Sequence, residues 1–154
     1  MKYNPSDFLP QKPPMQFITA IESFDSENQS LVTRVDVRED DLLFQKNING
    51  IHSTVALEYM AQSVACCVGV QKFESTGKFT AAVGFVLGSR DLHISIPKFN
   101  VNESYYVHVL PVFGDANMAA FECKIYDNKN SIVADGILNV FRPDDIKDFM
   151  EKMS

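Results

Sequence analysis

The feature that most constrains this chain is a run of apolar and small residues, GIHSTVALEYMAQSVACCVGV, at positions 50–70. From Val55 to Val70 the run has no polar stripe, and a helix that is apolar on all sides is usually buried. Yet Glu58 lies near its start. Because burying an unpaired carboxylate costs free energy, Glu58 either reaches solvent at the rim of the fold or is held in a cavity for chemistry.

Strand-like segments lie on both sides of this helix in the sequence. Residues 15–24 and 31–37 precede it, and the second segment alternates apolar and polar residues with a period of two. Four more such segments follow, at 79–97, 103–114, 118–127 and 131–143. A helix that is apolar all round needs cover on nearly every side, and a curved antiparallel sheet supplies it. The order predicts an α+β domain, although other α+β packings also fit.

The length of 154 residues suits one core, so we expect residues 1–154 to form a single domain. Prolines in residues 1–15 predict an extended arm, and residues 144–154 form a short polar tail. The formal charge of −6 argues against a nucleic-acid partner. The apolar run around residues 55–70 is expected to be too short and interrupted to span a bilayer. With no secretory signal in the N-terminal residues, we expect a cytoplasmic protein without a membrane partner.

Cysteine and histidine residues give no ligand pattern for a metal ion. Two of the three cysteines are adjacent, Cys66 and Cys67, which matches neither a disulfide framework nor a zinc site. We predict reduced thiols packed in the core. His93 and His108 fall in strand-like segments and are expected to be ordinary strand positions.

Three residues around the start of the helix could carry chemistry. Glu58 and Gln62 are four apart and therefore share a helix face, so the Gln62 amide could donate to the carboxylate and hold its rotamer. His52 lies just before the helix, and His with Glu in one pocket is the usual pair for moving protons. Ser53 or Thr54 could cap the first turn, whose free N–H groups could polarise a carbonyl oxygen. The alternative for His52 is a loop residue satisfied by the backbone.

Several stretches together resemble a known enzyme family. LEYMAQ at 57–62 resembles the central helix of the 3-hydroxyacyl-(acyl carrier protein) dehydratases of the FabA/FabZ type, which have the hotdog fold. Residues 8–24 and 83–107 resemble that family's opening and its long strand with the following turn and strand. VLGSR at 86–90, FEC at 121–123 and LNVFRP at 138–143 resemble the divergent ApeP-type branch, associated with aryl polyene biosynthesis.

The resemblance implies a homodimer or higher homo-oligomer that dehydrates 3-hydroxyacyl thioesters. The substrate would arrive on the phosphopantetheine arm of acyl carrier protein, and the enzyme would need no cofactor of its own. In the family a histidine removes the proton next to the carbonyl, and an acid protonates the departing hydroxyl. The resemblance assigns the acid to Glu58 and the carbonyl-binding N–H to Ser53. Gln62 and Gly84 are further candidate substrate-binding residues.

The histidine of the family pattern does not carry over. An ungapped count from Glu58 puts Phe44 at that position, and an early family histidine is Gln11 here. His52 could serve as the base only if this loop folds differently from the family pattern. Two other functions therefore stay open, an acyl-thioester hydrolase that uses the carboxylate alone and a non-catalytic acyl-binding protein.

Overall fold

The computed structural model of the chain describes residues 3–79, 86–115 and 118–141. Six strands form one antiparallel sheet in the order β1-β2-β6-β7-β8-β4. Their bounds are β1 Ala20–Asp25, β2 Ser30–Asp36, β4 Val86–Ile94, β6 Ser104–Gly114, β7 Met118–Tyr126 and β8 Ile132–Phe141. A small second sheet pairs β3 Gly50–His52 with β5 Lys98–Asn100. The helical elements are the 3₁₀ turns η1 Pro5–Asp7 and η2 Ser53–Val55 and the helix α1 Ala56–Thr76.

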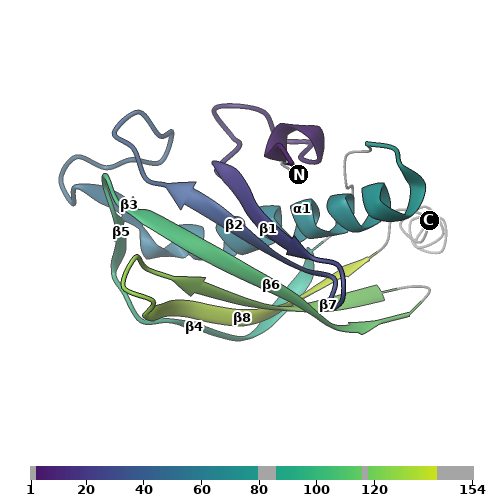
Figure 1. Cartoon of the computed structure of the whole chain (residues 1–154). Coiled ribbons are helices and arrows are strands. Elements are labelled where there is room, and N and C mark those ends of the chain that lie inside the picture. The colour runs from purple at the N-terminus through teal and green to yellow at the C-terminus, as the bar shows by residue number, and fades with distance from the viewer. Residues whose placement is uncertain (1–2, 80–85, 116–117, 142–154) are drawn as a thin grey trace, which may run out of the picture.

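The long helix is covered by the sheet on one side and by the N-terminal arm on the other. Figure 1 shows α1 running across the inner face of the six-stranded sheet, with η1 on the opposite side of the helix. Burial alternates along β2, whose inward side chains pack in the same core as those of α1. A buried hydrogen bond of 2.7 Å joins Thr33 Oγ1 of β2 to Ser63 Oγ of α1. Within the six-stranded sheet, the predicted order of two strands, one buried helix and four strands is confirmed.

The helix is longer than the apolar run suggested. It continues to Thr76, and Gly77 ends it with a left-handed φ of 74° and an N–H that donates to the Phe73 carbonyl at 2.8 Å. Together η2 and α1 span 24 residues, which by length and composition is enough to cross a membrane, so the expectation that the run is too short was wrong. In the fold, 61% of its most apolar window is buried within the domain.

The chain before β1 differs from the prediction. The first strand begins at Ala20 and not at residue 15, and the arm is interrupted by η1. Pro5 occupies the first turn of η1, where its missing N–H costs nothing, and the Asn4 side chain accepts from the Ser6 N–H. The tail 144–154 and residues 80–85 of the segment 79–97 lie outside the described residues.

The sheet formed by β3 and β5 was not predicted, because three-residue strands leave no alternating pattern. Its two strands approach closely at Gly50, where a Cβ atom would lie 2.2 Å from the Phe99 carbonyl oxygen. Glycine is therefore required at this position. The pairing places Lys98 directly opposite His52 and fixes the residues that enter α1.

All three cysteines are buried and free, as predicted. Burial raises the pKa of the Cys66, Cys67 and Cys123 thiols to about 12, so they stay protonated near neutral pH. No cluster of histidine, cysteine or carboxylate side chains suited to a metal ion occurs among the described residues.

Candidate active site

The carboxylate that stands out in the sequence lines a pocket at the N-terminal end of α1. Glu58 is half-buried, so it lies neither on an open surface nor in a closed core. The pocket has a volume of about 390 Å³. It is lined by residues of the arm, the loop before β3, β3 itself and the start of the helix: Met15, Phe17, Leu43, Gln45, Ile51, His52, Thr54, Val55 and Glu58. The two side chains that the sequence singled out thus line one largely apolar pocket, and both come from one chain.

Gln62 holds Glu58 in the pocket, as its spacing predicted. The Gln62 Nε2 atom donates to Glu58 Oε1 at 2.9 Å and to the Met15 carbonyl at 2.9 Å. The Gln62 Oε1 atom accepts from the Phe17 N–H at 2.9 Å, and the side chain is only 1% exposed. One buried amide therefore fixes the carboxylate rotamer and binds the arm to the helix. Glu58 Oε2 has no hydrogen-bond partner among the described residues.

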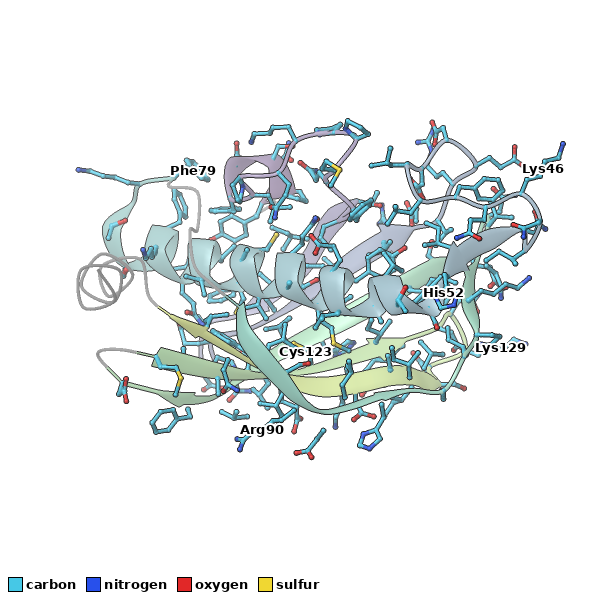
Figure 2. All side chains as sticks on the ribbon, turned by 180° about the vertical axis from the view of Figure 1, so that it is seen from behind. Lys46, His52, Phe79, Arg90, Cys123 and Lys129 are labelled. Atoms are coloured by element: carbon cyan, nitrogen blue, oxygen red, sulfur yellow. The ribbon has the colours of Figure 1, made fainter. Side chains whose placement is uncertain are left out.

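His52 lies at the exposed rim of the pocket, and its ring caps the first turn of the helical segment. The Nδ1 atom accepts from the Thr54 backbone N–H at 3.2 Å and lies 3.1 Å from Thr54 Oγ1. The predicted caps, Ser53 and Thr54, therefore give way to His52, whose ring does what a capping Asn or Asp usually does. Figure 2 shows His52 beside the start of the helical segment, at the end of the molecule that also carries Lys46.

Ser53 and Phe44, which the sequence analysis also considered, do not line this pocket. The Ser53 N–H donates to the Pro97 carbonyl at 3.2 Å and so is not free to bind a carbonyl oxygen. Phe44, at the position of the family histidine, is half-buried, and its neighbours Leu43 and Gln45 line the pocket while it does not. Gly84 lies outside the described residues.

The two remaining histidines lie on strands away from the pocket. His93 on β4 is exposed, and its Nδ1 atom lies 3.3 Å from Asp135 Oδ1. His108 on β6 packs on the Tyr126 ring, and partial burial, with Lys124 nearby, lowers its pKa. Both are ordinary strand positions, as predicted.

Tyr59, next to Glu58 in the sequence, is a core residue. Its ring is fully buried and packs edge-on against Phe17 and Phe99, at centroid distances of 6.3 and 5.1 Å. Burial raises the pKa of the Tyr59 hydroxyl, which has no hydrogen-bond partner among the described residues. The residue therefore supports the pocket from behind and does not open into it.

Sequence reasoning missed three contributions to the site. Thr54 was considered only as a cap, whereas its backbone N–H donates to the His52 ring and orients it. Met15 and Phe17 reach the pocket through contacts with Gln62 that span more than forty residues of sequence. Leu43 and the loop around it follow no periodic pattern.

Comparison with known proteins gives the context for this site. The family model described as ApeP dehydratase, of the ApeP-like family, matches residues 3–151. The structure of the dehydratase heterocomplex ApeI:P from Xenorhabdus doucetiae has a TM-score of 0.82, with 20% identity over 93% of this chain and 93% of that chain. No functionally curated protein matches the sequence significantly.

Other solved structures are similar in fold alone. The PaaI protein of the phenylacetic acid degradation operon of E. coli has a TM-score of 0.59 and 11% identity, over 79% of this chain and 77% of that one. A hypothetical thioesterase from Streptococcus pneumoniae, solved with coenzyme A, has a TM-score of 0.59 and 12% identity, over 79% and 83%. These neighbours confirm the hotdog fold predicted from the sequence. With a family match over nearly its whole length, the chain belongs to the ApeP-like family of dehydratases.

Proposed function

We propose that this protein removes water from 3-hydroxyacyl thioesters to give 2-enoyl thioesters. The observation that carries the proposal is the pocket that Glu58 and His52 both line, since dehydration requires a group that takes a proton from C2 and a proton for the departing hydroxyl. The apolar walls of Met15, Phe17 and Ile51 suit an acyl chain. Membership of a dehydratase family supports the same reaction.

The acyl group would be carried on the phosphopantetheine arm of acyl carrier protein, an acidic partner, and this chain would need no cofactor of its own. The net charge of −6 opposes such docking, so local cations must provide the attraction. Lys98 lies opposite His52 on the small sheet, and Lys46 lies at the same end of the molecule (Figure 2). Arg90 lies on β4, away from this end, and does not contribute to such a patch.

We expect the protein to work as an oligomer in the cytoplasm. The similar ApeI:P structure is described as a dehydratase heterocomplex, which supports assembly with a second dehydratase subunit. The homodimer implied by the family resemblance is the alternative assembly. Native mass spectrometry of the purified chain, alone and mixed with a second dehydratase-type subunit, distinguishes the two assemblies.

A second candidate function is hydrolysis of acyl thioesters. A single carboxylate can activate water without a histidine, and a fold neighbour is described as a hypothetical thioesterase. A third is acyl binding without turnover.

The products separate these functions. Wild-type protein and the Glu58→Gln variant are incubated with 3-hydroxyacyl thioesters of several chain lengths, carried on acyl carrier protein. Loss of one water by wild type, and none by the variant, is the result that dehydration predicts. Release of free thiol would indicate hydrolysis. No product with any substrate, together with binding that survives Glu58→Gln, would indicate a binding protein.

A further inference from the structure

The hydrogen bond at the His52 ring fixes where the ring carries its proton. A backbone N–H can only donate, so the bond from Thr54 N to His52 Nδ1, 3.2 Å long, needs a lone pair on Nδ1. A neutral imidazole has one N–H and one lone pair. In the state that makes this bond, Nε2 therefore carries the proton.

A ring held in this state is a poor general base. Nε2 has no lone pair to accept the C2 proton, and protonation at Nδ1 would break the bond that orients the ring. Full donation of the Nε2 proton would leave an imidazolate anion, since the ring holds no second proton. The one role that the geometry favours for His52 is to donate a hydrogen bond from Nε2 and keep the proton.

The proposed dehydration needs a hydrogen-bond donor to the thioester oxygen. The backbone N–H that the family resemblance assigned to the thioester oxygen belongs to Ser53, and it donates to the Pro97 carbonyl. The Thr54 hydroxyl lies 3.1 Å from His52 Nδ1, so it is engaged with the His52 ring and not with the thioester oxygen. A neutral histidine at a helix N-terminus polarises a substrate carbonyl in triosephosphate isomerase, a precedent for this arrangement on another fold.

We infer that His52 polarises the thioester carbonyl through Nε2–H while Glu58 performs both proton transfers, an inference that rests on the proposed dehydration. The Gln62 amide occupies Glu58 Oε1, which leaves Oε2 to accept the proton from C2. The electrons of the C2–H bond form the C2–C3 double bond as the C3–O bond breaks. Glu58 then gives the same proton to the departing hydroxide, so water leaves and the carboxylate is restored. Glu58 thus keeps the acid role implied by the resemblance and also takes the base role, while His52 binds the carbonyl oxygen.

Three variants of His52 test whether a hydrogen-bond donor at the position of Nε2 is needed. In His52→Gln an amide N–H₂ lies near the place of Nε2, whereas in His52→Asn the side-chain oxygen still caps the Thr54 N–H but nothing replaces Nε2. His52→Ala removes both. We expect kcat to fall about 10²–10³-fold in the Ala and Asn variants, the usual loss for one carbonyl-polarising donor, and at least tenfold less in the Gln variant. Equal loss in the Gln and Ala variants, with wild type active, would overturn the inference and leave the dehydratase standing.

The protonation site is read directly by ¹⁵N NMR of the imidazole rings in the full-length protein. We expect the Nε2–H tautomer for neutral His52, and loss of that preference in Thr54→Pro, which removes the backbone donor. An Nδ1–H tautomer for wild-type His52 would overturn the inference. If wild type forms no enoyl thioester from any 3-hydroxyacyl substrate, the proposed function fails, and the assigned roles fail with it.

Discussion

The two ends of α1 are held by the same N-terminal arm in different ways. At the C-terminal end the arm packs: the Phe8 ring lies so close to the helix that a Cβ atom on Gly69 would come within 2.5 Å of it. The Tyr3 ring packs edge-on against Phe8, and the Tyr3 hydroxyl donates a hydrogen bond to the Glu74 carboxylate. At the N-terminal end the arm is bound by the hydrogen bonds of Gln62 instead.

The difference shows how a helix that is buried on nearly all sides can still carry a reactive group. Aromatic packing fills the space at one end. Hydrogen bonds from a single buried amide hold the arm at the other end and leave a cavity between Met15, His52 and Glu58. Aromatic packing thus lies at one end of the helix and the proposed chemistry at the other, so substitutions at the two ends should have different effects.

The largest effect is expected from Glu58→Gln, which changes the chemistry and little else. The amide keeps the shape of the side chain and can still accept from Gln62, but it cannot take a proton. We expect kcat for dehydration to fall about 10²–10⁴-fold, with the melting temperature nearly unchanged. Turnover within tenfold of wild type would show that the chemistry lies elsewhere.

Phe8→Ala should act in the opposite way, on stability. Phe8 of the arm is fully buried against the helix, and its truncation is expected to lower the free energy of unfolding by about 3–5 kcal/mol. Urea denaturation measures this change, with Ile132→Ala at a 46% exposed strand position as the control. The folded fraction should retain its kcat. A small stability change would mean that the arm is not docked at this end.

Gln62→Leu should affect both properties, since this residue belongs to the arm and to the pocket. It leaves the Phe17 N–H and the Met15 carbonyl unpaired, which is expected to cost about 1–3 kcal/mol. It also frees Glu58, so kcat should fall. Gln71→Leu is the matched control, because Gln71 donates from the same helix to the Gln29 carbonyl, away from the pocket. If both variants lowered kcat equally, Gln62 would have no special role in positioning Glu58.

The smallest effect is expected from a single added methyl group, in Gly69→Ala. The nearest atoms belong to Phe8, including its Cβ at 2.8 Å, so the ring cannot simply swing aside. We expect overpacking to cost about 1–3 kcal/mol without a change in kcat. Gly88→Ala serves as the control, since no atom of the described residues lies within 4 Å of the added atom and the change should be near zero.

Local patterns predicted much of this molecule. Alternation located β2, strand-like segments located β6, β7 and β8, and spacing of four residues predicted the pair of Glu58 and Gln62. Patterns that lie within one element survive folding, because helix and strand geometry alone determines them. The helix end at Gly77 could also have been predicted, since glycine readily adopts the left-handed φ found there.

Contacts between distant segments could not be predicted. The Ser53 N–H is occupied by Pro97 only because β3 pairs with β5, and three-residue strands have no period. The link from Gln62 to the arm depends on how the arm docks, which no local pattern encodes. The tautomer of His52 is likewise set by a neighbouring backbone group. The family pattern, in addition, places its catalytic histidine at the position of Phe44 and not at His52.

The most direct test of the account is to locate the acyl group itself. A 3-hydroxyacyl amide of pantetheine, a stable analogue of the thioester, is titrated into ¹⁵N-labelled protein while amide shifts are followed. The account predicts that the largest shifts map to the pocket, around Leu43, His52 and Glu58, and that Glu58→Gln weakens them. Shifts concentrated at the other end of α1, around Phe8 and Phe73, would contradict the claim that the N-terminal end of the helix carries the chemistry.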